Sequence, residues 1–292
     1  MNIPIKKIFL EPTTYCNLKC KYCCSQNGTL IRRSACYMND ELFDKILKEL
    51  AFTEVEEINF WGFGEPFFHQ NYLNMCKKLV SSGIKIYCNT NGHYNRSPEE
   101  IINSGISKII FSIDGFSEKT YKIYRELGDF KKVVHNIKSL AELRNRLNSQ
   151  MEIIWQFIVF PWNEREVSSV ENEYKELGIQ IIYKTNLGIQ DIPDNNKYIR
   201  QANNNGYVNI TVDLYTDVSE QCNWPVIQTD GKVSLCLYDS MGDYIIADLS
   251  KQTLYDAFNG EVWENFRSKK RSNELLICKE RCSFWYNNYK NV

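Results

Sequence analysis

The sequence predicts an α/β fold built on a parallel β-sheet, and three observations support this prediction. From Ile5 to about Lys184, apolar runs of strand length alternate with amphipathic runs of helix length. The alternation repeats about six times at a spacing of about 30 residues, which is typical of successive βα units. Several helical runs stop at a glycine just before the next strand, where a left-handed cap ends a helix. An open doubly wound sheet and a curved partial barrel both fit this pattern.

Each repeat is assigned from its own residues. The expected strands are the six apolar runs Lys7–Leu10, Glu57–Trp61, Ile84–Asn89, Lys108–Ser112, Glu152–Val159 and Gln180–Tyr183. The first expected helix begins at Asn39 and Asp40, and its apolar residues recur at the spacing of one helix face up to Leu50. The other expected helices cover Asn71–Ser81, Pro98–Asn103, Phe130–Leu147 and Glu164–Leu177.

The chain after the repeats has a different pattern. Residues 185–221 are rich in Asn and Asp, and they lose clear periodicity apart from one strand-like run at Tyr207–Tyr215. We expect them to connect a larger domain, residues 1–184, to a small α+β domain, residues 222–292. The expected elements of the small domain are a hairpin with an Asp-Gly turn and two short helices, over Trp224–Leu237, Thr253–Phe258 and Glu261–Lys269.

The composition is that of an ordinary globular protein and disfavours several classes of partner. Of 292 residues, 43% are apolar and 24% are charged, and the net charge is −1. This balance gives no support for nucleic acid or an anionic membrane as the main partner. No apolar run is long enough to span a bilayer, and no apolar stretch of signal-peptide length precedes Glu11. We therefore expect a cytoplasmic protein.

Cysteine is the unusual feature of the composition. The chain has 11 cysteines but only three histidines, and no histidine lies near a cysteine cluster, which disfavours a mixed Cys/His zinc site. Cys16, Cys20 and Cys23 have the spacing C-x3-C-x2-C in the loop after the first expected strand. Three thiolates this close can each ligate one iron of a cubane and leave the fourth iron open. From the spacing alone, a zinc loop completed by Cys24 is the alternative.

The residues around this loop resemble the signature of the radical S-adenosylmethionine superfamily. The resemblance runs from Glu11 to Cys23 and includes the aromatic Tyr22 before the last cysteine. Three further motifs follow at the ends of the next expected strands: Trp61-Gly62-Phe63-Gly64-Glu65-Pro66, Asn89-Thr90-Asn91-Gly92 and Ser112-Ile113-Asp114-Gly115. Read singly, such glycines are turn residues and such carboxylates are helix caps. Their joint occurrence after the cysteine loop favours the family.

The resemblance implies a fold, a site and a chemistry. The family fold is a partial (β/α)6 TIM-like barrel with its chemistry at the C-terminal strand ends. Cys16, Cys20 and Cys23 would hold a [4Fe–4S] cluster whose open iron is chelated by S-adenosylmethionine. One electron would then release a 5′-deoxyadenosyl radical that abstracts a substrate hydrogen atom. The implied cofactor-binding residues are Tyr22, Gly64, Glu65, Pro66, Asn91, Ser112, Asp114 and Gln156.

A second group of cysteines lies near the end of the chain and comprises Cys222, Cys236, Cys278 and Cys282. Four thiolates hold either zinc or a fully ligated [4Fe–4S] cluster, and the spacing does not choose between them. The group and its surroundings resemble the short SPASM/twitch extension of radical S-adenosylmethionine enzymes, which implies one auxiliary [4Fe–4S] cluster. The final pair departs from that pattern, because it is spaced C-x3-C where C-x2-C is usual.

The resemblance leaves several activities open. The favoured hypothesis is dehydrogenation of a small sugar or polyol, with the auxiliary cluster accepting an electron and a flavodoxin- or ferredoxin-type protein supplying the first one. A maturase acting on a ribosomal peptide is an alternative. Only fifteen residues precede Cys16, so no leader-binding domain is expected before the barrel, which favours a small molecule.

Two further alternatives complete the set of hypotheses. An epimerase needs a hydrogen donor, and Cys88 and Cys24 are the candidates. Cys88 shares a strand face with Thr90 and is expected to point into the barrel, and Cys24 is adjacent to the cluster loop. A non-catalytic iron–sulfur or zinc protein is the remaining hypothesis. The strand-end motifs argue against it, because a structural metal site needs no cofactor pocket.

Overall fold

The computed structural model describes most of the repeat region and part of the C-terminal region. The described residues are 5–21, 23, 33–184, 224–237, 239, 241–271 and 274–275. The expected connector, residues 185–221, lies outside them together with its strand-like run at Tyr207–Tyr215. None of the described helices combines the length and the apolar character needed to cross a membrane.

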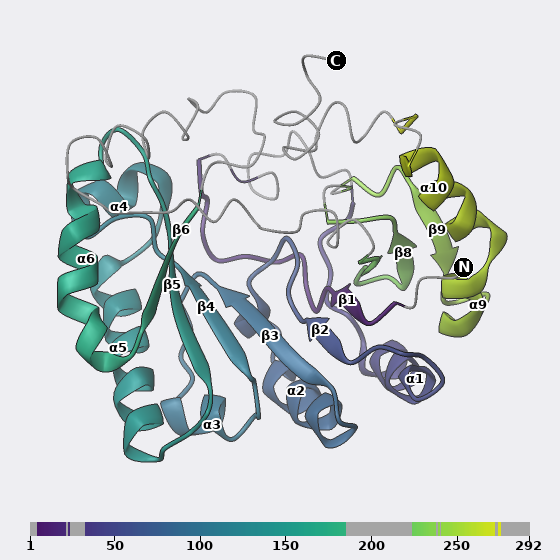
Figure 1. The fold of residues 1–292 in the computed structure, drawn as a ribbon, viewed down its shortest axis with the longest axis horizontal. Coiled ribbons are helices and arrows are strands. Elements are labelled where there is room, and N and C mark those ends of the chain that lie inside the picture. Colours follow the sequence, from purple (N-terminus) through teal and green to yellow (C-terminus); the bar gives the residue numbers. More distant parts are fainter. Residues whose placement is uncertain are drawn as a thin grey trace.

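The strands of the repeat region form a parallel sheet in chain order. They are β1 (Lys7–Leu10), β2 (Glu57–Asn59), β3 (Lys85–Thr90), β4 (Lys108–Ser112), β5 (Glu152–Ile158) and β6 (Gln180–Lys184). Each pairs in parallel with the next along the chain. In a doubly wound sheet the order reverses at an interior strand, so the consecutive order identifies a barrel-type sheet. The predicted partial (β/α)6 barrel is confirmed, and Figure 1 shows the curved sheet.

Helices cover the outer, convex side of this sheet (Figure 1). They are α1 (Asp40–Leu50), α2 (Tyr72–Ser81), α3 (Pro98–Ile102), α4 (Glu118–Tyr124), α5 (Phe130–Arg146) and α6 (Val167–Tyr174), with 3₁₀ turns η1 (Pro66–Phe68), η2 (Glu164–Glu166) and η3 (Lys175–Leu177). The helix expected over Glu164–Leu177 is therefore divided into η2, α6 and η3. Helix α4 was not expected; it begins at a capping box in which Thr120 replaces the usual Glu or Gln.

Local capping sets the ends of these helices as expected. The Asn39 side chain accepts a hydrogen bond from Leu42 N and begins α1. Three helical segments run into glycines in the left-handed region: Gly83, Gly105 and Gly178, with φ of 85°, 77° and 66°. These caps turn the chain back toward the sheet, so each following strand begins two or three residues after its glycine.

The C-terminal elements extend the barrel sheet. They are β7 (Val226–Ile227), β8 (Lys232–Ser234), β9 (Ile245–Asp248), α9 (Leu254–Asn259) and α10 (Glu261–Arg271). Strand β7 pairs in parallel with β1 and antiparallel with β8, so the described residues contain one nine-stranded sheet. The predicted hairpin is confirmed, and its turn closes with a 3.0 Å bond from Gly231 N to Gln228 O. The strand β9 was not expected.

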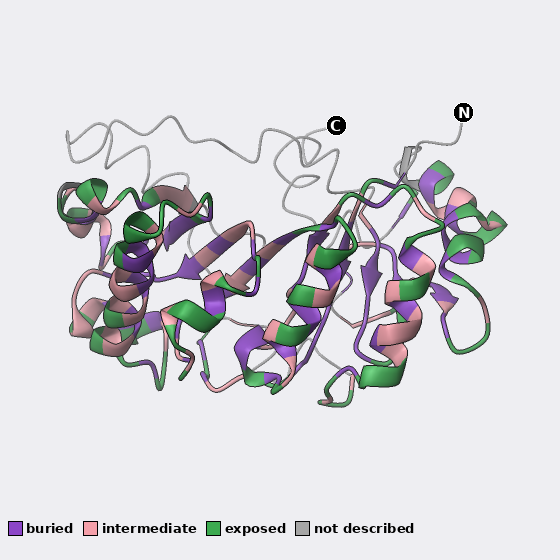
Figure 2. Ribbon diagram, turned by 90° about the horizontal axis from the view of Figure 1, so that it is seen from below, coloured by how far each residue is buried: buried purple, intermediate pink, exposed green. Residues whose placement is uncertain are grey.

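One continuous apolar core joins the two regions. Ile227, Leu249 and Trp263 of the C-terminal elements belong to the same buried cluster as Ile8 and Phe43. Figure 2 shows buried strands beneath helices whose outward residues are exposed. Because sheet and core are shared, the C-terminal hairpin has a defined position beside β1, and this position matters for the site.

Candidate active site

The first cysteine loop follows β1 and packs into a small apolar cluster of its own. Cys20 is buried there with Tyr124 and Phe160, while Cys16 and Cys23 pack around them and are partly exposed. The loop is fastened to the end of α4, because Lys21 N donates to Tyr124 O at 3.0 Å. The loop therefore presents three thiols at the carboxyl end of the sheet.

Two of the three sulfurs receive hydrogen bonds from residues that follow later strands. Asn91 Nδ2 lies 3.6 Å from Cys16 Sγ, and Arg125 Nη1 lies 3.6 Å from Cys20 Sγ. Burial raises the pKa of the Cys16 thiol to about 12, and it also raises the pKa of Cys20 against the opposing charge of Arg125. Cluster ligands bind as thiolates, so bound iron would offset this cost of burial. The donor set, with N–H groups directed at sulfur, fits an iron–sulfur cluster.

The side chains of Cys16, Cys20 and Cys23 are not arranged around a single metal position. Among the described residues, no group of three His, Cys, Asp or Glu side chains is arranged to hold a single metal ion. A cubane does not require such convergence, because each cysteine ligates a different iron. Tyr22 and Cys24, which the sequence placed beside this cluster, lie outside the described residues.

The loop after β2 lies directly against the start of the cysteine loop. Glu65 N donates to Tyr15 O at 2.8 Å. A Cβ on Gly64 would lie 2.3 Å from the carbonyl oxygen of Thr13 and 2.6 Å from that of Tyr15. No side chain fits at this contact, so glycine is needed for the two backbones to approach. Pro66 then begins η1, where its missing N–H leaves no bond unmade.

The Glu65 carboxylate joins the ends of β2 and β3. It is buried and accepts hydrogen bonds from Thr90 Oγ1 at 2.7 Å, from Asn91 N at 2.7 Å and from Phe67 N at 3.2 Å. Burial is the dominant effect and raises the pKa of Glu65 to about 7, although the hydrogen bonds oppose it. Glu65 thereby holds Asn91, whose side chain reaches Cys16.

We expect the stability of the cofactor-free protein to fall as the pH rises through about 7. The pKa of Glu65 is raised above the ordinary value of 4.5, so the folded state binds this proton more tightly than the unfolded state. The contribution of the Glu65 proton to the free energy of unfolding is fully present below pH 4.5 and is lost as the pH rises through about 7. It amounts to about 3 kcal/mol. In urea unfolding, Glu65→Gln should lack this fall of the unfolding free energy with rising pH. The exposed control Glu99→Gln should keep it, and equal slopes in all three proteins would contradict the prediction.

Toward the carboxyl ends of the strands, neutral polar side chains line the inner face of the sheet. At the amino ends the same face carries two ion pairs, Lys7–Glu57 and Lys108–Glu152. Ser112 Oγ donates to Asn89 Oδ1 at 2.8 Å, and Gln156 Nε2 lies 3.4 Å from Ser112 Oγ. Asn59 belongs to the same face, because it pairs with Tyr87, two residues before Asn89. Gln156 Oε1 is buried without a hydrogen-bond partner among the described residues. A buried acceptor of this kind suits a hydroxyl or amino group of a bound molecule. Strand alternation was the signal that could have found Asn59 and Asn89 from sequence.

Asp114, two residues after the end of β4, contacts Arg125 and Ile158 through its two carboxylate oxygens. Its Oδ2 accepts bonds from Arg125 Nε at 2.7 Å and Arg125 Nη2 at 2.6 Å, and its Oδ1 accepts one from Ile158 N at 2.7 Å. The sequence placed Asp114 among the cofactor-binding residues. The structure brings it to Arg125, which in turn reaches Cys20.

Cys88 lies on the face of β3 opposite the polar row. It is fully buried in the main core beside Tyr72 and Cys76 of α2, and burial raises its pKa well above the ordinary value. The expectation that its strand face points into the barrel is wrong, because α2 covers the outer side of the sheet. The role of hydrogen donor stays a prediction without support from this placement.

Of the second cysteine group, Cys236 is among the described residues; Cys222, Cys278 and Cys282 lie outside them. Cys236 follows β8 by two residues. Ser234 of β8 pairs with Val226, and Val226 pairs with Phe9 of β1. Because β8 runs opposite to β1, Cys236 lies toward the amino end of β1, whereas the first cysteine loop leaves its carboxyl end. The inner face of the barrel lies between these two levels.

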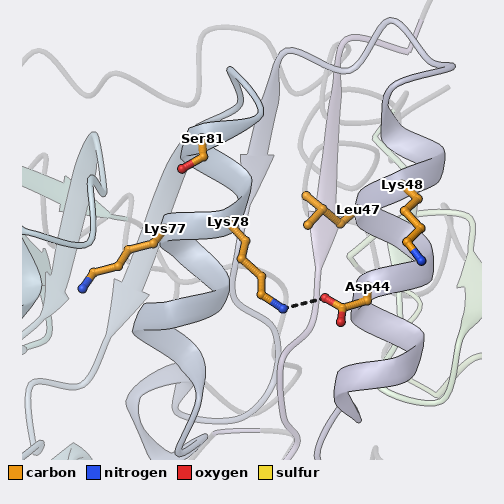
Figure 3. Close-up of a pocket in the computed structure, with 6 residues that line it drawn as sticks. All are labelled: Asp44, Leu47, Lys48, Lys77, Lys78 and Ser81. Carbon is orange, nitrogen blue, oxygen red and sulfur yellow. Dashed lines mark hydrogen bonds and ion pairs between the residues drawn. The ribbon is translucent and has the colours of Figure 1, made fainter.

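A shallow hollow on the outer face of the barrel contains none of the candidate residues. It lies between α1 and α2 and is lined by Asp44, Leu47, Lys48, Lys77, Lys78 and Ser81 (Figure 3). Lys78 and Asp44 form an ion pair of 2.7 Å across it. The helix layer separates this hollow from the strand ends, so we assign it no part in the chemistry.

A three-cysteine loop after the first strand of a partial barrel, with polar residues at the following strand ends, defines a class of iron–sulfur barrel enzymes. The model of the radical SAM superfamily matches residues 10–160, and the chain belongs to this superfamily. The model of the SPASM iron–sulfur cluster-binding domain matches residues 220–283. The cofactors are therefore a [4Fe–4S] cluster and S-adenosylmethionine in the barrel and an auxiliary cluster in the SPASM domain.

Relatives with sequence similarity have varied functions. The "tungsten-containing aldehyde ferredoxin oxidoreductase cofactor-modifying protein" of Pyrococcus furiosus is 28% identical over 190 residues, 63% of this chain and 49% of that protein. A GTP 3',8-cyclase of Rhizobium etli is 27% identical over 144 residues, 47% of this chain and 41% of that protein. The chain thus spans about half the length of these relatives or less. A GTP 3',8-cyclase of Peptoclostridium acidaminophilum is 22% identical, over 93% of this chain and 91% of that protein.

Solved structures share the fold at low identity. BtrN in complex with AdoMet and 2-DOIA has a TM-score of 0.55 at 15% identity and covers 92% of this chain and 88% of that chain. Streptococcus suis SuiB bound to S-adenosylmethionine has a TM-score of 0.66 at 14% identity, with coverages of 96% and 72%. Native anSMEcpe with AdoMet and the Cp18Cys peptide has a TM-score of 0.63 at 21% identity, with coverages of 96% and 86%. At these identities the likeness concerns the fold.

Proposed function

We propose that this chain dehydrogenates a small sugar or polyol in a radical reaction that begins with cleavage of S-adenosylmethionine. The observation that carries the proposal is the register of the C-terminal hairpin on β1. It sets Cys236 toward the amino end of the barrel, opposite the loop of Cys16, Cys20 and Cys23. A substrate on the inner face would then have the site of hydrogen abstraction on one side and an electron acceptor on the other.

The residues of the site have distinct roles in this proposal. When bound, the cluster and S-adenosylmethionine supply the one-electron chemistry that removes a hydrogen atom from the substrate. Gly64 allows the backbone of the β2 loop to lie against the cysteine loop. Glu65 holds Asn91 in place, and Asn91 donates to Cys16. Glu65 and Asn91 are buried, so water is excluded from the hydrogen bonds that hold Asn91 in place.

The substrate class is argued from the inner face of the sheet. Toward the carboxyl ends of the strands its polar side chains are amides and a hydroxyl, and Gln156 Oε1 still lacks a donor among the described residues. Neutral groups of this kind pair with hydroxyl groups at little cost in desolvation, and the charged side chains at the amino ends of the strands already pair with one another. BtrN, whose complex contains AdoMet and 2-DOIA, is similar over nearly the whole of both chains. A flavodoxin- or ferredoxin-type protein is our proposed electron donor.

Peptide modification is the second candidate, and two of the fold relatives favour it. SuiB has been solved with its precursor peptide SuiA, and anSMEcpe with the Cp18Cys peptide. An epimerase is less favoured, because the candidate donor Cys88 packs against α2 on the outer side of the sheet. We therefore rank oxidation of a small molecule first.

Anaerobic reconstitution tests the proposal. The protein should bind about eight irons per chain, as two cubanes require. With dithionite and S-adenosylmethionine it should form 5′-deoxyadenosine, and a panel of deuterated sugars and polyols should yield a carbonyl product with deuterium in the 5′-deoxyadenosine. Product from peptides alone would establish the second candidate instead. Fully reconstituted protein that forms no 5′-deoxyadenosine would overturn the enzymatic proposal.

Cys236→Ala should separate the two halves of the reaction. The variant should lose about half of its iron, as expected for loss of one of two cubanes. It should still form 5′-deoxyadenosine, because the first cysteine loop is unchanged, but oxidised product should fall at least tenfold, roughly the lower end of the effect of losing a metal-site contact. Iron analysis and product chromatography measure both effects. Unchanged product formation would contradict an electron-accepting role for the auxiliary cluster.

A further inference from the structure

Arg125 connects a buried carboxylate to one sulfur of the first cysteine loop. It follows α4, and its guanidinium has two separate sets of contacts. Nε and Nη2 lie 2.7 and 2.6 Å from Asp114 Oδ2, and Nη1 lies 3.6 Å from Cys20 Sγ. The planar fork of arginine is suited to such divided contacts, because its five N–H donors point in fixed directions.

The guanidinium is closely restrained. Asp114 is fully buried, and the bond from Ile158 N at 2.7 Å fixes its other oxygen to β5. The guanidinium carbon of Arg125 lies 4.8 Å from the centre of the Tyr124 ring, and the side chain is 11% exposed. Arg125 therefore cannot leave Cys20 without breaking two short charge-assisted bonds to Asp114.

The contact at Cys20 differs in kind from the contact at Cys16. Asn91 brings a neutral N–H donor to Cys16, whereas Arg125 brings both a donor and a positive charge to Cys20. Reduction of an iron–sulfur cluster adds a negative charge. Hydrogen bonds to the sulfurs and nearby positive charge favour the reduced state and raise the reduction potential.

We propose that Arg125 makes the first cluster easier to reduce by its bond to Cys20, and that Asp114 is a positioning residue that acts through Arg125. This inference rests on the proposed function, since it assumes a cluster on Cys16, Cys20 and Cys23. It assigns Asp114 a task other than contact with S-adenosylmethionine. The pair would set the driving force for the electron that starts the reaction.

Potentiometric titration followed by electron paramagnetic resonance tests the effect on the cluster. The full chain is used in a Cys236→Ala background without S-adenosylmethionine, so that the signal comes from the first cluster. Arg125→Gln should make reduction about tenfold less favourable, a shift of about 59 mV to more negative potential for one electron. Arg125→Lys keeps the positive charge and should shift the reduction potential less than Arg125→Gln does. The control Lys122→Gln removes a charge from an exposed position on α4, the helix that Arg125 follows, and should leave the reduction potential unchanged.

A second measurement detects the contact itself. Protein labelled with ¹⁵N-arginine should show a ¹⁵N coupling to the reduced cluster in pulsed electron paramagnetic resonance. The coupling should disappear in Arg125→Lys and weaken in Asp114→Asn, and it should persist in Lys122→Gln. This measurement on otherwise unaltered protein keeps the proposal testable if Arg125→Gln fails to assemble a cluster.

The outcomes separate this inference from the proposed function. An unchanged potential in Arg125→Gln, combined with a raised KM for S-adenosylmethionine, would assign Arg125 to cofactor binding and overturn the inference alone. Absence of the ¹⁵N coupling in a protein with a normal cluster would do the same. A wild-type chain that binds no iron after reconstitution would instead overturn the proposed function.

Discussion

Cys20→Ser is expected to abolish cleavage of S-adenosylmethionine. Cys20 is the most buried of the three loop cysteines and packs with Tyr124 and Phe160. Serine is a poor ligand for iron, so the first cluster should not assemble, and the iron content should fall from about eight to about four per chain. Formation of 5′-deoxyadenosine, measured by chromatography after anaerobic reconstitution, should fall to background.

The matched control is Cys36→Ser. Cys36 is a partly buried free cysteine of the described chain, and its Sγ lies 2.8 Å from Thr229 Oγ1, a contact that serine preserves. This variant should keep full iron content and full cleavage. If Cys20→Ser retained both clusters and its activity, the assignment of the first cysteine group to the catalytic cluster would be wrong.

Gly64→Ala is expected to have the second largest effect. The new Cβ would lie 2.3 Å from Thr13 O and 2.6 Å from Tyr15 O, and backbone atoms cannot rotate away from it. The β2 loop or the start of the cysteine loop must shift, at a cost of about 1–3 kcal/mol in stability. A displacement of about 1 Å at a reacting centre costs about 100-fold in rate. We therefore expect about that loss in 5′-deoxyadenosine formation.

Gly83→Ala is the matched control for the loss of a glycine. Its added Cβ would meet no atom within 4 Å, but its φ of 85° strains any other residue. The variant should lose about 1–2 kcal/mol in stability, with cleavage unchanged below its melting temperature. Equal losses of cleavage in the two variants would show that stability, and not the position of the cysteine loop, limits the reaction.

Much of the fold could be predicted because the bounds of its strands and helices depend on residues that are neighbours in the sequence. Strand Lys7–Leu10 and strand Lys108–Ser112 have the predicted bounds, since a short apolar run between turn residues depends on its own side chains. The helix after Asn39 begins where its cap predicts. Helix α4 escaped prediction, because it has only seven residues and its capping box uses Thr120.

The candidate site was predictable only in part. The cysteine triplet is visible in sequence because one short loop carries all three ligands. Asn89 was missed as a candidate. Alternation along its strand could have marked it, but its contact with Ser112 depends on a register that is set across the sheet. The direction of Cys88 was predicted wrongly, because alternation shows which residues share a face but not which face α2 covers.

By itself the sequence determined the βα repeat, the helix caps, the cysteine loop and the hairpin turn. Each of these depends on residues within a few positions of one another. Only the tertiary structure decided the consecutive strand order, the pairing of β7 with β1, and the path from Asp114 through Arg125 to Cys20. Those features join residues up to more than two hundred positions apart. Such contacts form when the packed sheet brings distant segments together, and no local pattern encodes which partners will meet.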